Sequence, residues 1–543
     1  MGAPPFRLWA ASQYCVVVIP RSLCRPMTAH LNRVRDLTPL ATLAPGEHET
    51  VAVRSPLTGE LLVDLPMAAP SDLDHAMAIA RAAQVDWAGV PIKERIRVFR
   101  RFRALLLDRA EDVLDVLQLE TGKARRHAFE ELADVSFVCS YYCHVAAPLL
   151  GSRRRRGAIP GLTRTREVRH PHGVVGVIAP WNYPLVLAVS DALPAVLAGN
   201  AVVVKPDIQT THTALAALAL LIEAGLPAGV LQVVPGDGPG VGAGLVDRVD
   251  YVSFTGSTDT GRLVAERAGA RLIGCSLELG GKNPMIVRED ADLLKALDGA
   301  IRGSFANAGQ LCISTERLYV HESVFEPFLR QFVARAQALQ LGAGLDYEAD
   351  MGSLANEHQL RKVVDHVRDA VEKGAVVRAG GNARPDIGPL FFEPTVLSGV
   401  TPDMTVFSEE TFGPVVSVYS FSSDEEALHL ANDSRYGLNA SIWSTDLRVT
   451  EGMARRIEAG TVNINEAYSA AWGSVDAPMG GRKDSGTGRR HGAEGLLKFT
   501  ESQTIAVQTG TALDLSAPWL KKKSARRAVL AALKRYRSGS RRR

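Results

Sequence analysis

The sequence lacks an uninterrupted apolar run of 18 residues anywhere in its 543 positions, so it predicts no membrane-spanning helix. The sequence also lacks a large excess of charge of either sign. It has 62 Lys and Arg and 59 Asp and Glu, which gives a net charge of +3. That balance argues against a nucleic-acid partner for the main body of the chain. The length allows two or three domains with a large core.

Cysteine is also scarce. The six thiols belong to Cys15, Cys24, Cys139, Cys143, Cys275 and Cys312. None has the spacing of a metal-ligand set, so no metal is predicted, and a reduced, cytoplasmic setting fits this usage. Residues 1–27 hold three arginines and no acid. Their apolar stretch is too short for a targeting peptide, so we assign them no function and expect Met27 to be the start of translation.

From residue 172 onward, strand and helix patterns alternate. Continuous apolar strands are expected at 174–178, 201–204, 230–234 and 249–254. The helices between them are typical of a parallel, doubly wound sheet that is buried on both faces. The same alternation from 290 to 432 indicates a second α/β domain. Upstream, Ser71 and Asp74 resemble a helix start, and long helices are predicted at 92–122 and 126–148.

Polar groups follow four successive strands of the first sheet. They are Trp181-Asn182, Lys205, a glycine turn at 236–242, and Gly256-Ser257. Any one of them could be ordinary turn chemistry. Ligands bind at the carboxyl ends of parallel strands, however, so four in a row favour a nucleotide site. The glycine turn is not placed as a dinucleotide fingerprint requires, and Gly256-Ser257, opening a helix, is the better phosphate site.

A carboxyl and a thiol stand out further on. Glu278 ends an apolar segment and is followed by Gly280-Gly281, and Cys312 lies 34 residues later. A thiol and a carboxyl that meet in a fold can act as nucleophile and general base. Taken singly, a cysteine is more often a small buried apolar residue than a nucleophile, and a glutamate between leucines is more often a hydrogen-bonded carboxylate at a strand end than a base.

Seven motifs set these residues in a wider pattern. They are PWNYP (180–184), VVVKP (202–206), FTGSTDTG (254–261), LELGGKNP (277–284), NAGQLC (307–312), ETFGPV (410–415) and PMGGRKDSGTGR (478–489). Together they resemble the aldehyde dehydrogenase superfamily over about residues 45–510. Within that superfamily the likeness is greatest to the bacterial, mycobacterial-type succinate-semialdehyde dehydrogenases. The resemblance implies a Rossmann-type cofactor domain, an α/β catalytic domain and a small β oligomerisation segment.

The resemblance also implies a mechanism. Cys312 would attack an aldehyde, and the Asn182 side chain with the Cys312 backbone N–H would hold the oxyanion. Hydride transfer to a nicotinamide would leave a thioester, and Glu278 would activate the water that releases the acid. The expected substrate is succinate semialdehyde. Medium-chain or aromatic aldehydes, and a non-catalytic binding protein on the same fold, remain alternatives.

The cofactor positions are carried over in the same way. They fall on Trp181, Lys205, Pro206, Asp207, Ile208, Gly256, Ser257, Leu279, Glu410 and Phe412. Many NAD-using relatives have a Glu where this chain has Ile208. Without that carboxylate the 2′-phosphate of NADP is repelled less, and Lys205 could form an ion pair with this phosphate. Both effects favour NADP over NAD. Asp207 could still repel a phosphate, so NAD stays open.

Four positions depart from the family pattern. Ser190 and Ala306 stand where succinate-semialdehyde members carry arginines, and an unpaired substrate carboxylate would be costly to bury. Either another cation, for example from loop 460–482, replaces them or the substrate differs. Asp191 stands where relatives commonly carry Lys. Ser314 leaves Cys312 without a neighbouring second thiol.

The expected domain division follows. Residues 1–44 form an N-terminal extension. The cofactor domain comprises 45–148 with 172–280, and the catalytic domain comprises 281–482. Segments 149–171 and 500–510 would assemble a homodimer or homotetramer. The basic tail, 511–543, has eleven Lys and Arg and no acid after Leu520, so it could rest on a membrane surface or simply be solvated.

Overall fold

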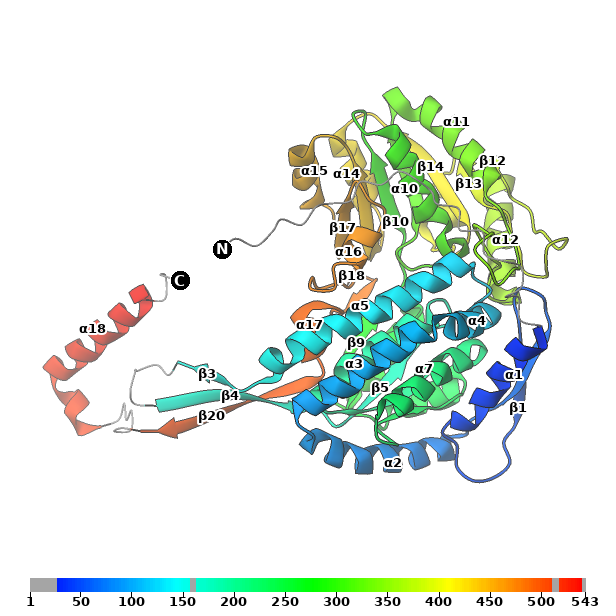
Figure 1. Ribbon diagram of the computed structural model, residues 1–543. Coiled ribbons are helices and arrows are strands. Elements are labelled where there is room, and N and C mark those ends of the chain that lie inside the picture. The colour runs from blue at the N-terminus through cyan, green and yellow to red at the C-terminus, as the bar shows by residue number, and fades with distance from the viewer. Residues whose placement is uncertain (1–26, 157–162, 510–516, 540–543) are drawn as a thin grey trace, which may run out of the picture.

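The computed structural model describes residues 27–156, 163–509 and 517–539. Two α/β units stack on each other, and a narrow β arm projects from one side (Figure 1). Within the described ranges no helix has both the length and the apolarity that crossing a bilayer requires. The expectation for residues 1–26 falls outside these ranges.

The first sheet has six strands in the order β19-β9-β8-β5-β6-β7. Their bounds are β5 Val174–Ile178, β6 Ala201–Lys205, β7 Leu231–Val233, β8 Tyr251–Thr255, β9 Gly274–Glu278 and β19 Gly486–Thr487. All neighbouring pairs are parallel except β19 with β9. The predicted doubly wound sheet is confirmed, with strand ends shifted by one or two residues.

Helices cover both faces of this sheet. One layer contains α3 Ile92–Asp108, α4 Ala110–Thr121, α5 Arg125–Leu150, α6 Asp191–Ala198 and α7 Thr211–Ala224, and the other contains α2 Pro70–Gly89, α8 Ala243–Val246 and α9 Thr258–Ala270. In β6, Val202 and Val204 pack in the first core, whereas Ala201 and Val203 pack in the second. A strand buried on both faces is apolar throughout, which is why the sequence showed it.

Two helix predictions were wrong in detail. The helix expected at 92–122 is two helices, because Arg109 leaves the helical region at φ −110° and ψ 27°. Helix α2 begins at Pro70, and Asp72 rather than Ser71 serves its first turn by accepting from the Ala69 N–H at 2.6 Å. Asp74 instead pairs with Arg248.

The second sheet has seven strands in the order β12-β13-β14-β11-β10-β16-β17, parallel except for β12 with β13. Its strands are β10 Asn283–Val287, β11 Thr315–His321, β12 Val376–Ala379, β13 Thr395–Ser398, β14 Val415–Phe421, β16 Asn439–Trp443 and β17 Thr461–Ile464. Helices α10 Leu293–Phe305, α11 Glu322–Ala338 and α12 Glu357–Glu372 share one core, and α14 Asp424–Asn432 and α15 Leu447–Ala454 share the other.

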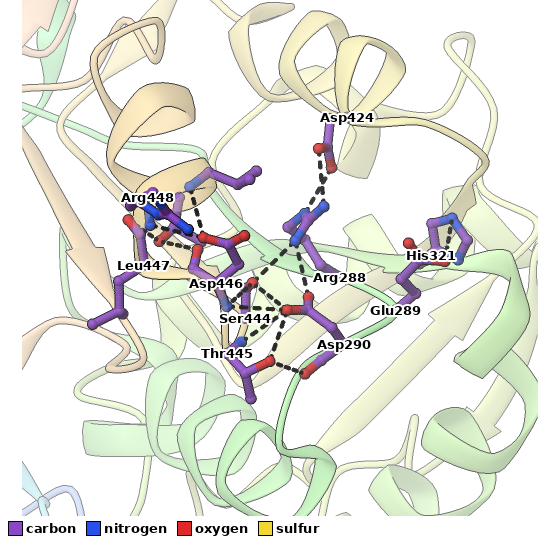
Figure 2. Close-up of polar contacts among 12 residues, drawn as sticks. Arg288, Glu289, Asp290, His321, Asp424, Ser444, Thr445, Asp446, Leu447 and Arg448 are labelled. Atoms are coloured by element: carbon purple, nitrogen blue, oxygen red, sulfur yellow. Dashed lines mark hydrogen bonds and ion pairs between the residues drawn. The ribbon is translucent and has the colours of Figure 1, made fainter.

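A polar cluster ties the carboxyl ends of β10, β14 and β16 together (Figure 2). The Arg288 guanidinium donates to Asp424 at 2.8 Å and to Asp290 at 2.9 Å. The second oxygen of Asp290 accepts from the Ser444 hydroxyl and from the Thr445 backbone N–H. Because these groups satisfy one another, the cluster is a structural clamp.

The β arm is a three-stranded antiparallel sheet in the order β20-β4-β3. It contains β3 Arg153–Arg155, β4 Thr163–Pro171 and β20 Thr500–Gln508. Helix α18 Lys523–Gly539 lies beyond the tip of the arm (Figure 1). The remaining elements flank the two units: α1 Met27–Leu37, the hairpin of β1 Thr50–Arg54 and β2 Leu61–Pro66, α13 Thr405–Ser408, β15 Tyr436–Gly437 with β18 Arg482–Lys483, α16 Ser469–Trp472, and α17 Gly492–Leu497.

Candidate active site

The loop that carries Cys312 follows α10 and has an unusual backbone. Asn307, Ala308 and Gly309 are consecutive left-handed residues, with φ of 50°, 53° and 70°. A Cβ on Gly309 would lie 2.0 Å from the carbonyl oxygen of Gly413, so only glycine fits there. Left-handed backbone costs about 1–2 kcal/mol at a non-glycine residue. The protein therefore holds strain three to five residues before the thiol, as functional sites often do.

The turn that follows Glu278 contacts Cys312, and the charge of Glu278 acts on the Cys312 thiol. A Cβ on Gly281 would lie 2.4 Å from the carbonyl oxygen of Cys312, so the two backbones are in contact. The Asn283 amide donates to that carbonyl at 2.8 Å and to the Ser314 carbonyl at 2.7 Å. The acid and the thiol that the sequence placed 34 residues apart are thus brought together. Asn283 lies in a quoted motif, but sequence reasoning did not single it out.

Asn182 joins them from the first sheet, just after β5. Its side chain is buried, and Nδ2 donates to the carbonyl of Gln310 at 3.1 Å. Its own carbonyl accepts from Lys123 Nζ at 2.7 Å and from Asn307 Nδ2 at 3.1 Å. Both the side chain and the backbone of Asn182 are therefore fixed against the Cys312 loop.

Lys123 and Glu131 were missed by sequence reasoning. They form a fully buried ion pair, and Glu131 also accepts from the backbone N–H groups of Leu185 at 2.9 Å and Val186 at 3.1 Å. The pair thus fixes the PWNYP turn at Asn182 and the two residues that follow it. Two charged residues eight positions apart belong to no motif, so the sequence carried no signal for this role.

The electrostatics set the resting protonation. Burial raises the pKa of the Cys312 thiol to about 12, and the carboxylates of Glu278 and Glu410 add to the rise. Burial likewise raises the pKa of Glu278 to about 7. At neutral pH the thiol therefore keeps its proton, whereas the carboxyl is poised between its two forms, as a general base should be.

The predicted phosphate side lies at the carboxyl ends of β6 and β8. Lys205 is buried, and burial lowers its pKa. Ser257 caps α9, where its Oγ accepts from the Thr260 N–H at 3.3 Å. The Gly256 N–H donates to the Glu278 carbonyl at 3.1 Å. A helix N-terminus after β8 and a lysine at the end of β6, on the same edge of the sheet, suit an anionic ligand.

The predicted nicotinamide side is built from both sheets. Glu410 accepts from the Gly281 N–H at 2.7 Å, and burial raises its pKa to about 7. Phe412, at φ 56°, meets the Trp181 ring edge-on with centroids 5.5 Å apart. Leu279 lies buried against Gly261. These residues surround the turn that contacts Cys312.

The residues after β6 face a different space. Pro206 ends the strand, and the Asp207 carboxyl accepts from the Gln209 N–H at 3.0 Å. Burial raises the pKa of Asp207. Asp207 and Ile208 line a cavity of about 360 Å³, and neither Lys205 nor Gly256 lines it.

The structure shows what surrounds Ser190 and Ala306, the two positions where succinate-semialdehyde members carry arginines. Ser190 is buried and donates to Asp134 at 3.1 Å, and Ala306 is also buried. Loop 460–482 supplies no replacement cation, because its single basic residue, Arg482, lies on β18, paired with β15 and exposed. Instead Trp472 packs, like Cys312, against the large apolar core of the first sheet.

The doubly wound sheet, with polar groups gathered at the ends of its strands, has the fold of dehydrogenases solved with a nicotinamide cofactor. More particularly, the chain belongs to the aldehyde dehydrogenase family, whose model matches residues 43–505. This confirms the family and the fold expected from the seven motifs.

Individual relatives agree with this membership. The chain is 50% identical over 493 residues to a Mycolicibacterium smegmatis protein provisionally named succinate-semialdehyde dehydrogenase with NADP(+), covering 91% of this chain and 95% of that protein. It is 40% identical over 456 residues to the 4,4'-diapolycopene aldehyde oxidase of Methylomonas sp., covering 83% and 84%. The betaine aldehyde dehydrogenase of Staphylococcus aureus, solved with NAD+, superposes with a TM-score of 0.84 at 32% identity, covering 90% and 99%.

Proposed function

We propose that this protein oxidises an aldehyde to its carboxylic acid through a thioester on Cys312. The observation that carries the proposal is the meeting of Cys312, Glu278 and Asn182. A non-catalytic binding protein would not need a strained nucleophile loop beside a carboxyl with a pKa near 7. Turnover of any aldehyde that is lost in Cys312→Ala supports the proposal, and undiminished turnover in that variant refutes it.

Each residue has a distinct task in the proposed reaction. The Cys312 thiol gives up its proton to water, and the thiolate sulfur forms a bond to the aldehyde carbon. The C=O π electrons move to the oxygen, which becomes an oxyanion held by Asn182 Nδ2 and the Cys312 N–H. A nicotinamide cofactor, held by Lys205, Ser257 and Glu410, would accept the hydride whose loss from the adduct leaves a thioester on Cys312. Glu278 then takes a proton from water, the hydroxyl oxygen bonds to the acyl carbon, and the C–S bond breaks to return the thiolate.

We propose NADP as the preferred cofactor, with NAD as the alternative. The Mycolicibacterium relative is named for NADP(+) and the Staphylococcus structure contains NAD+. Ile208 offers no carboxylate to repel a 2′-phosphate, and the Asp207 carboxyl is occupied by Gln209. The groups that would hold the cofactor are Lys205, Ser257 and Glu410. Ile208→Glu should move the ratio of kcat/KM from NADP toward NAD by about tenfold or more, since one charge contact of this kind is worth about 1.5–3 kcal/mol.

Succinate semialdehyde is the first substrate candidate, following the name of the relative that is 50% identical. Medium-chain, aromatic or other apolar aldehydes are the second, because Ser190 and Ala306 offer no cation to a distal carboxylate. The 40% identical relative is named for an apolar polyene aldehyde. Comparing kcat/KM for succinate semialdehyde, hexanal and benzaldehyde decides between them. A preference for the uncharged aldehydes rejects the first candidate.

We propose that two or four copies assemble through the β arm, and that the domain division expected from the sequence holds. The arm supports this because it projects from the body and carries exposed apolar side chains, Ile505 and Val507, on β20. An unsatisfied strand edge with apolar neighbours favours pairing between chains. Light scattering of the full chain and of an Ile505→Lys, Val507→Lys variant tests this, and a monomeric full chain refutes it.

We propose that the protein is cytoplasmic and that its tail contacts an anionic membrane surface. Leu530 and Leu533 are each 56% exposed on α18, and Trp519 beside it is 48% exposed. Apolar side chains among many cations are typical of helices that lie on anionic lipid. Flotation with phosphatidylserine vesicles should be lost when the chain ends at Leu513. Equal flotation of both forms, or none with either, refutes the contact.

A further inference from the structure

A buried ion pair beside the proposed base has no part in the proposed reaction. Arg490 Nε donates to Asp191 Oδ1 at 3.0 Å, and the two side chains are 10% and 6% exposed. Asp191 begins α6, whereas Arg490 follows the glycine-rich segment after β19. Burying two charges costs several kcal/mol per ion before their attraction is counted. The pair therefore needs a reason to lie this deep.

Arg490 lies close to Glu278 across Gly480. Arg490 and Met479 exchange backbone hydrogen bonds of 2.6 and 2.9 Å, which places Arg490 next to Gly480. A Cβ on Gly480 would lie 3.0 Å from Glu278 Oε1. Glu278 Oε1 and Arg490 Nη2 are both buried, and neither has a hydrogen-bond partner among the described residues. Glu278 Oε1, an acceptor, and Arg490 Nη2, a donor, thus lie on either side of Gly480 with their hydrogen-bonding capacity unused among the described residues.

The other charged groups that face Glu278 do not duplicate Arg490. Lys498 donates to Ser276 at 3.1 Å, and burial lowers its pKa. Arg489 donates to backbone carbonyls, and Asp191 opposes ionisation of Glu278. Among these charges, that of Arg490 opposes most strongly the rise that burial causes in the pKa of Glu278. It also opposes the rise in the pKa of Cys312.

We propose that Arg490, held in place by Asp191, is a positioning residue that stabilises the carboxylate of Glu278 and the thiolate of Cys312. The inference rests on the roles given to those two residues in the proposed function. When the C–S bond breaks, the departing thiolate and the protonated Glu278 both lie within reach of that cation, which favours loss of the proton from Glu278.

The test is the pH dependence of two separate events in Arg490→Gln. The first is alkylation of Cys312 by iodoacetamide without cofactor, and the second is steady-state turnover. Both profiles should move to higher pH, by about one unit or more, because loss of a nearby opposite charge shifts a pKa by about 1–3 units. Arg490→Lys should restore most of the wild-type profile.

A double variant keeps the test decisive if Arg490→Gln does not fold. Arg490→Gln with Asp191→Asn removes one charge of each sign and leaves no unpaired ion. Because Arg490 acts on Glu278 more strongly than Asp191 does, both profiles should still move to higher pH, but by less. Arg456→Ala is the matched control, since it breaks an exposed pair with Glu425 and should leave both profiles in place.

Two outcomes overturn the inference or its basis, and they can be told apart. If Arg490→Gln lowers both rates equally at every pH, Arg490 is only structural and the inference fails. If Cys312→Ala retains turnover, the proposed function itself fails. Inactive Cys312→Ala together with an unshifted Arg490→Gln profile rejects the positioning role alone.

Discussion

Asn182→Ala removes the proposed oxyanion donor and leaves its surroundings in place. The Asn182 carbonyl is held by Lys123 and Asn307 independently of the side chain, so the loop should keep its position. Loss of one oxyanion donor costs about 3 kcal/mol of transition-state stabilisation. At about 1.36 kcal/mol per factor of ten, kcat/KM should fall about 150-fold.

The assay follows the absorbance of reduced cofactor over a range of aldehyde concentrations below and above KM, with thermal unfolding measured in parallel. Asn200→Ala is the matched control, because this buried amide donates to the carbonyls of Ala195 and Phe499 at the opposite, amino end of β6. The control should lose stability but keep its activity. If Asn182→Ala loses less than about fivefold, or no more than the control, the assignment of Asn182 is wrong.

Four further predictions follow from the same site. Glu278→Gln should release about one equivalent of reduced cofactor per subunit and then stall; steady turnover in a stopped-flow trace would contradict its role. Since the pKa of Glu278 is raised from 4.5 to about 7, wild-type turnover should increase as the pH rises through 7. The same shift lowers the free energy of unfolding of the wild type progressively between pH 4.5 and 7, and by a constant amount above pH 7. Glu278→Gln should therefore be more stable than wild type at pH 8, by at most about 3 kcal/mol, and show no gain at pH 4. Lys123→Met leaves Glu131 buried without its partner and should cost about 3–5 kcal/mol in denaturant unfolding; a loss under about 1 kcal/mol would contradict a buried, ionised pair.

The parts that sequence reasoning found are those written in local patterns. Strands such as β6 were predicted because burial of both faces requires apolar residues throughout. The end of β9 was predicted because the flexible pair Gly280-Gly281 follows it. The sequence placed the helix start at Ser71, whereas the helix begins at Pro70. Asp72 fixes this start by accepting hydrogen bonds from the backbone N–H of Ala69 and from that of the distant Ala44. A capping pattern read over four residues cannot show the second contact.

The parts that were missed are pairings between distant segments. Lys123 with Glu131 and Arg490 with Asp191 are buried ion pairs, yet each charged residue looks like ordinary surface composition in the sequence. The same holds for loop 460–482, where a cation was considered and the fold places Trp472 against the core. Burial decides what these residues do, and burial depends on the whole fold.

The antiparallel pairing of β19 with β9 bears on how the molecule is synthesised. The strand that ends in Glu278 has its outer edge closed by Gly486–Thr487, 208 positions later for the Gly486–Glu278 pair. While the ribosome is still adding those residues, the nascent chain displays an open strand edge that invites association with other chains. The first sheet is therefore complete only after Thr487 has been added, and products that end before Gly486 should aggregate.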